Sequence, residues 1–145
     1  MLIKETALSF TYVRAYREAE LPVLEAAREG LCRLRLLRRH RETLRTTPRG
    51  RELLTDQDGL LLALHGDMGA ADRFDADAWP LVEAVLLDRG PLEVDRLTRL
   101  VRPLIHLHGW RGARGEAFDA RSLWGELLPL LCQAEAYGLI RRDPA

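Results

Sequence analysis

The stretch GLCRLRLLRRHRETLRTTPRGRELL, residues 30–54, decides the fold that we expect for this chain. Its hydrophobic pattern changes from a helical period to a period of two. Cys32, Leu34 and Leu36 fall on one face of an extended segment, because successive side chains of a strand point to opposite faces. Arg33 and Arg35 fall on the other face. This pattern predicts a strand that is apolar on one side and basic on the other.

A turn and a return strand follow this segment. Residues 38–42 contain no apolar side chain and predict the turn. In the sequence TLRTT that comes next, Leu44 points inward and Arg45 outward. The sequence therefore predicts a two-stranded hairpin that buries Leu34, Leu36 and Leu44 and carries arginines on its solvent face and tip.

Helices are expected on both sides of the hairpin. Thr47 and Pro48 predict the start of a helix. A threonine side chain accepts a hydrogen bond from a free amide group of the first turn, and proline at the first helical position has no amide hydrogen that needs a partner. Gly30 is expected to end the preceding helix as a left-handed cap. Hydrophobic periodicity predicts helices at residues 6–20, 20–30, 48–54, 59–68, 77–89, 93–107 and 119–137, and a short strand at most after residue 138.

Acidic side chains and one proline give the expected limits of the later helices. Asp56 or Asp58, then Asp77, then Asp119 are expected as N-caps, because aspartate accepts hydrogen bonds from free amide groups. Pro103 is expected to kink or stop the helix that contains it.

The expected architecture is mainly α with one small antiparallel β-hairpin. A chain of 145 residues predicts a single compact domain, 1–145, with two candidate sub-units at 1–66 and 75–145. The segments ELPVLEAAREGL and ELLPLLCQAEAYGL are alike, because each is a proline-containing helix that ends in Gly-Leu. A degenerate tandem repeat and a chance similarity both stay open.

A net charge of zero hides a strong polarity along the chain. Residues 28–51 carry nine arginines against Glu29 and Glu42, whereas residues 52–95 carry eleven acids against Arg73 and Arg89. Such runs indicate either a surface for an anionic partner or pairing between the two segments.

Sequence motifs for catalysis and metal binding are missing. The chain has no glycine-rich phosphate loop and no serine nucleophile motif, so no catalytic or cofactor-binding residue is predicted. His106 and His108 are spaced i and i+2, which places them on different helix faces, and no metal site is predicted. The interpretation of Asp72, Asp75 and Asp77 is a solvated loop and a helix cap.

The chain lacks signals for a membrane or a secretory route. No apolar run approaches the roughly 20 residues of a membrane span, and the N-terminal residues lack the apolar region of a signal peptide. Cys32 and Cys132 are too few for a disulfide framework. These features predict free thiols, no membrane partner and a cytoplasmic location.

Residues 30–54 resemble the wing and following helix of winged-helix regulators, in which Gly-Leu, a basic hairpin and Thr-Pro-x-Gly-Arg-x-Leu-Leu recur. Residues 21–142 also resemble, more loosely, the uncharacterised helical domain found with plasmid and transposon passenger proteins of actinobacterial type. The first resemblance implies a winged-helix, helix-turn-helix type of DNA-binding fold, and the second implies no known activity. The candidate reading helices, ELPVLEAARE and SLWGELLPLLCQAEAY, are apolar and acidic, unlike helices that read bases in the major groove.

These observations predict a non-enzymatic, DNA-associated, winged-helix-like module that contacts the phosphate backbone of double-stranded DNA. The residues expected at this interface are Arg33, Arg35, Arg38, Arg39, Arg41, Arg45 and Arg49. The alternative is a protein-interaction or oligomerisation module, with a protein partner or a second copy of the chain. Exposed arginines favour the first, and pairing with Glu52, Asp56 or Asp58 favours the second.

Overall fold

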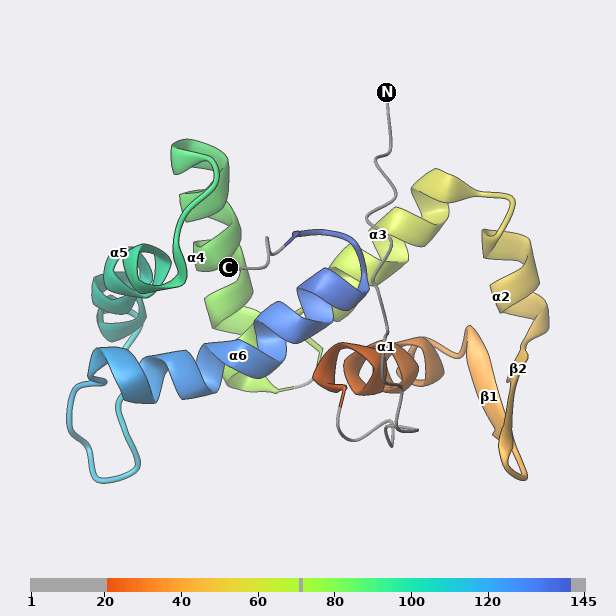
Figure 1. The fold of residues 1–145 in the computed structure, drawn as a ribbon, viewed down its shortest axis with the longest axis horizontal. Helices are drawn as coiled ribbons and strands as arrows, with labels where there is room; N and C mark the ends of the chain where they lie inside the picture. The colour runs from red at the N-terminus through yellow and green to blue at the C-terminus, as the bar shows by residue number, and fades with distance from the viewer. Residues whose placement is uncertain (1–20, 71, 142–145) are drawn as a thin grey trace, which may run out of the picture.

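The computed structural model describes residues 21–70 and 72–141, and in these ranges the chain forms six helices and one antiparallel hairpin (Figure 1). The elements are α1 (Pro22–Arg33), β1 (Leu37–His40), β2 (Thr43–Thr46), α2 (Pro48–Leu53), α3 (Gln57–Asp67), α4 (Arg73–Arg89), α5 (Val94–Leu107) and α6 (Ala120–Ala136). The prediction of a mainly helical fold with one small hairpin is confirmed. The helix expected at residues 6–20 lies outside the described residues.

The hydrophobic core lies between α4, α5 and α6, and α1 packs along α6. Burial of these apolar side chains is the main favourable contribution to folding. The hairpin lies at the far end of α1, away from the α4–α5 side of the molecule (Figure 1). The side chains with no measurable exposure are Met68, Ala78, Val82, Val101, Ile105, Leu123, Leu127 and Ala134.

Three of the expected N-caps are confirmed. Thr47 Oγ1 accepts a hydrogen bond from the amide of Gly50 at 3.0 Å, and Asp56 and Asp119 cap α3 and α6 in the same way. The prediction for Asp77 is wrong, because α4 begins one turn earlier and Asp72 caps it. Asp77 instead accepts a hydrogen bond from Trp110 Nε1 at 3.0 Å.

Of the kink or stop expected at Pro103, the structure excludes the stop, and the absence of a strand in the described residues after Gly138 agrees with the expectation of a short strand at most. Helix α5 continues through Pro103 to Leu107, so this proline does not stop it. No strand forms in the described residues after Gly138, where Leu139 and Ile140 instead pack against the core.

The predicted start of the first strand is wrong by several residues. Cys32 and Arg33 belong to α1, and β1 begins only at Leu37. The helix extends because Leu31 and Leu34, three residues apart and therefore on one helix face, pack against the core. Tertiary packing here overrides the alternation of the local sequence.

The predicted burial of the hairpin leucines holds only in part. Leu36 is buried and Leu34 is half-buried, but Leu44 is 45% exposed. Leu44 lies opposite Arg39 in a sheet of only two strands among the described residues, so no third strand shields it. The hairpin therefore has no apolar core of its own.

The hairpin closes through a two-residue turn. The paired residues are Leu37 with Thr46, Arg38 with Arg45, Arg39 with Leu44, and His40 with Thr43, which leaves Arg41 and Glu42 as the turn. Arg41 has a φ of 55°, as the first residue of a tight hairpin turn requires. An arginine therefore occupies a left-handed position that glycine or asparagine would take at lower conformational cost.

Close contacts at its base hold the hairpin against the rest of the chain. The amide of Thr47 donates to the carbonyl of Leu36 at 3.0 Å, and Thr47 Oγ1 donates to the carbonyl of Arg35 at 2.6 Å. A Cβ at Gly50 would lie 2.3 Å from the carbonyl oxygen of Leu36, so only glycine allows α2 to approach this closely. The position of the hairpin thus depends on the end of α1 and the start of α2.

A buried carboxylate joins α1, α3 and α6. The side chain of Asp67 is 2% exposed and lies at the end of α3. Arg33 binds it through Nε and Nη2 at 2.8 and 2.6 Å, Tyr137 donates its hydroxyl at 2.5 Å, and Gln133 Nε2 donates at 3.0 Å. We call these four residues the Asp67 cluster.

The Asp67 cluster satisfies a charge that would otherwise be costly to bury, because a desolvated carboxylate needs both a counter-ion and hydrogen-bond donors. The hydrogen bond to Asp67 raises the pKa of Arg33. Burial, followed by the hydrogen bond to Asp67, raises the pKa of Tyr137. Arg33 and Tyr137 therefore hold their protons at neutral pH and keep donating to Asp67.

Gly30 lies inside α1 beside this cluster, and the prediction that it is a left-handed C-cap is wrong. It is buried, and a Cβ at this position would lie 1.7 Å from the hydroxyl oxygen of Tyr137. The glycine is needed for close approach of α6, and α1 continues beyond it to Arg33.

Candidate nucleic-acid interface and an acidic pocket

The hairpin, the segment before it and α2 carry many exposed arginines, on more than one face. The arginines expected at the interface are all exposed, and six of them are not bound to Asp67: Arg35, Arg38, Arg39, Arg41, Arg45 and Arg49. Arg51 of α2 is exposed as well. We call these seven residues the basic surface. Between residues 35 and 51 the only acid is Glu42, at the turn.

Arg38 and Arg45 face each other across the two strands. Directly opposed side chains in an antiparallel pair have Cβ atoms about 5 Å apart, and two like charges at that position destabilise the pair. Arg39 points to the opposite face of the ribbon, because side chains alternate along a strand. One face of the hairpin thus carries two adjacent guanidinium groups.

Within the described residues, no ion pair joins the basic surface to an acid. Glu52, Asp56 and Asp58, the acids that could have neutralised it, make no such pair, and Asp56 caps α3. The arrangement matches the first of the two expectations, in which the arginines stay exposed.

Arg33 lies apart from the basic surface. It belongs to α1, and both its Nε and its Nη2 are bound to Asp67. A guanidinium held by a buried carboxylate is not free to neutralise a phosphate, so Arg33 is left out of the interface proposed below.

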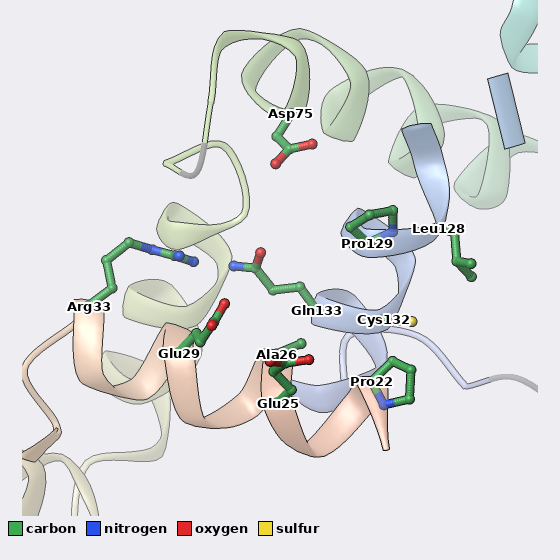
Figure 2. Close-up of a pocket in the computed structure, with 10 residues that line it drawn as sticks. All are labelled: Pro22, Glu25, Ala26, Glu29, Arg33, Asp75, Leu128, Pro129, Cys132 and Gln133. Carbon is green, nitrogen blue, oxygen red and sulfur yellow. The ribbon is translucent and has the colours of Figure 1, made fainter. Parts of the chain in front are cut away.

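A pocket of about 400 Å³ lies between α1 and α6, with the first turn of α4 at one end (Figure 2). The ionisable side chains in its wall are Glu25, Glu29, Arg33 and Asp75. Its apolar lining includes Ala26, Leu128 and Pro129. This volume suits a small molecule, since ligand pockets in proteins start at about 300 Å³.

Asp75 is a buried acid that sequence reasoning placed in a solvated loop, and that interpretation is wrong. It lies in the first turn of α4 and is 9% exposed. Its amide donates to Asp72 Oδ1 at 2.8 Å, but within the described residues no hydrogen bond or ion pair reaches its carboxylate. Burial raises its pKa to about 6, Asp72 and Glu126 add to this through their charges, and Arg33 opposes it.

We expect Asp75→Asn to stabilise the protein above pH 6 by about 3 kcal/mol, since each pKa unit corresponds to about 1.4 kcal/mol. The pKa is higher in the folded state than the ordinary value of about 3.9. The folded protein therefore binds the proton more tightly between about pH 4 and pH 6, and wild-type stability falls as pH rises through this window. Urea unfolding of both proteins at about pH 4 and pH 7.5 measures the difference.

The control for this measurement is Asp95→Asn, which changes an exposed acid in the first turn of α5. Its effect should not follow the same pH window. An Asp75→Asn protein that is less stable than wild type at both pH values would contradict the expectation.

Two residues of these sites, Asp67 and Asp75, had no signal in the sequence that marked them as buried. Asp67 follows His65 and Gly66 at a polar helix end, and Asp75 is one of three acids in a stretch rich in small residues. Their partners and walls come from α1 and α6, far away in the chain, so local periodicity could not find them.

No protein-family model, curated protein or solved structure matches this chain. Among the helices of residues 21–70 and 72–141, none combines the length and the apolar character needed to cross a membrane.

Proposed function

We propose that this chain is a non-enzymatic, DNA-associated module that contacts the phosphate backbone through its basic surface, in the manner of a winged-helix wing. The observation that carries the proposal is the Arg38–Arg45 pair, two exposed like charges held opposite each other, to which no acid of residues 21–70 and 72–141 is bound. Phosphates of a nucleic-acid strand are anions that arginine binds in a bidentate way. Binding them would relieve the repulsion between the two guanidinium groups.

The shape of the hairpin supports the same proposal. A two-stranded ribbon is narrow enough to enter the major groove of DNA, which is about 12 Å wide. The four residues of each strand extend roughly 13 Å at 3.3 Å per residue, so arginines on both faces and at the turn can follow a groove edge. Contacts of this kind give affinity with little choice of sequence.

Helix α1, which directly precedes the hairpin, does not supply base readout in this proposal. It packs along α6, and its exposed positions include Leu24 and Glu29 rather than a row of basic side chains. The resemblance to winged-helix regulators therefore enters the proposal through the wing alone.

The double variant Arg38→Ala/Arg45→Ala tests the proposal. If both residues contact phosphates, the slope of log K against log salt should become shallower by roughly 0.9 for each lost contact, and binding to all sequences should weaken about equally. Thermal stability should be unchanged or slightly higher, because the variant removes a repulsion between opposed charges. Fluorescence anisotropy with a mixed-sequence duplex at several salt concentrations measures the slope.

The matched control is Arg96→Ala/Arg99→Ala, which removes two exposed arginines from one face of α5. The total charge changes by the same amount, so a general electrostatic effect would alter both double variants alike. Absence of duplex binding by the wild-type protein at low salt, or an equal loss in the control, would refute the proposal.

A second candidate function is a protein-interaction or oligomerisation module. Three leucines of the α2–α3 region favour it, since Leu54, Leu61 and Leu62 are 69%, 54% and 74% exposed. Exposed apolar side chains that lie together are typical of surfaces that bind another protein. Sedimentation equilibrium without DNA separates the two functions, because only the second requires a stable assembly of protein alone.

A further inference from the structure

The acidic pocket between α1 and α6 takes no part in the proposed DNA contact. The pocket shares Arg33 and Gln133 with the Asp67 cluster, and it lies between α1 and α6 (Figure 2). The hairpin lies beyond the end of α1 (Figure 1). The charge of the pocket is also opposite to that of the basic surface, because three of its four ionisable wall residues are acids. A ligand of this pocket must therefore differ in charge from the phosphates proposed to bind the arginines.

Asp75 is the residue of this pocket that most directly indicates a ligand. Its side chain is more than nine-tenths buried and its carboxylate points into the pocket (Figure 2). No donor within the described residues satisfies this carboxylate, whereas the buried carboxylate of Asp67 a short distance away is fully bonded. Neither oxygen of this carboxylate is among the fully buried, unpartnered side-chain atoms of the described residues, so the carboxylate is open to a donor that enters the pocket.

The other polar groups of the wall restrict the charge of that partner. Arg33, the only cation among the lining side chains, is bound to Asp67. Gln133 directs its Nε2 donor to Asp67 and to Tyr137, so its amide oxygen is the atom left for a ligand. Glu25 and Glu29 add further acceptors on the α1 side (Figure 2). A ligand must therefore supply donors and positive charge.

The spread of these acceptors favours an organic cation over a metal ion. No group of three His, Cys, Asp or Glu side chains in residues 21–70 and 72–141 lies close enough together to hold a metal. An ammonium or guanidinium group on a short carbon chain can instead reach separated acceptors, and its stem can lie on Ala26, Leu128 and Pro129.

We propose that this pocket binds a small organic cation with an ammonium or guanidinium head group, and that Asp75 is the counter-ion of that head group. Glu25 and Glu29 then attract the cation toward the pocket, and Gln133 accepts one of its hydrogen bonds. The positive charge of the ligand favours the ionised form of Asp75, because it offsets the cost of desolvating the carboxylate.

The test uses two probes of the same shape, butylguanidinium and the neutral butylurea, in isothermal titration calorimetry with the full chain. At about pH 7.5 the Asp75 carboxylate is ionised, since its pKa is about 6. Wild-type protein should bind butylguanidinium saturably at millimolar concentrations and should not bind butylurea. Asp75→Asn should weaken the binding about 10-fold or more, because it removes a charge-assisted hydrogen bond from a site shielded from water.

Asp95→Asn serves as the matched control, because it removes an acid from the equivalent first turn of α5 outside the pocket. It should bind butylguanidinium as the wild type does. The Asp75→Asn protein is expected to fold, since it loses only an unpaired buried charge. No saturable binding by wild type, equal binding by Asp75→Asn, or equal binding of butylurea would each overturn the proposal.

Discussion

Replacement of Asp67 by asparagine is expected to lower the free energy of unfolding by about 3 kcal/mol, the lower end of the range for removing one partner of a buried ion pair. The lower end applies because the side chain of Arg33 is 35% exposed and can regain water. The amide of asparagine would also turn donors toward Tyr137 and Gln133, which now donate to Asp67. Urea unfolding measures the loss.

Asp58→Asn is the control within the same helix. Asp58 is exposed in the first turn of α3, so its loss should cost less than about 1 kcal/mol through the helix dipole. A double-mutant cycle with Tyr137→Phe should give a coupling energy of about 1 to 3 kcal/mol, since the two side chains share a hydrogen bond. Additive losses would mean that the hydroxyl of Tyr137 does not stabilise Asp67.

The second large effect is expected from Gly30→Ala. The new Cβ would lie 1.7 Å from the hydroxyl oxygen and 2.6 Å from Cζ of Tyr137, so the ring must move and its hydrogen bond to Asp67 must break. Overpacking and the lost hydrogen bond together should cost about 3 to 5 kcal/mol. The added methyl group would thus push α1 away from α6. Thermal unfolding of the variant and of the wild type measures the resulting loss of stability.

Gly125→Ala is the matched control, because Gly125 lies inside α6 with no atom near its missing Cβ. That substitution should stabilise the protein by up to about 1 kcal/mol through helix propensity. In a Tyr137→Ala background, Gly30→Ala should lose its cost, since the ring that it meets is gone. A large cost in that background would show that another contact requires the glycine.

Local signals in the sequence predicted the elements whose causes are local. Thr47 with Pro48, Asp56 and Asp119 were identified as helix starts because a cap acts within its own first turn. The turn predicted at residues 38–42 contains the observed turn, Arg41 and Glu42, but residues 38–40 belong to β1 instead. These features carried enough information to predict a mainly helical fold with one hairpin.

The errors arose where distant packing decided the outcome. Residues 32–36 alternate in polarity as a strand would, yet Leu31 and Leu34 pack against the hydrophobic core and the chain stays helical through Arg33. Asp75 looked like a loop acid because the walls that bury it belong to α1 and α6. The exposure of the hairpin arginines was predicted more fully, because an exposed side chain needs no distant partner.

The Asp67 cluster also has a consequence for the order of events during synthesis. Asp67 is made 70 residues before Tyr137, and Arg33 earlier still. While the ribosome adds those residues, α1 has no α6 to lie on, and the carboxylate has only one of its three partners. Because chains emerge N-terminus first, at about 5 to 20 residues per second, the hairpin reaches its final orientation only several seconds after its own residues have been joined. A nascent chain stalled before Tyr137 would present the basic hairpin on an unanchored helix.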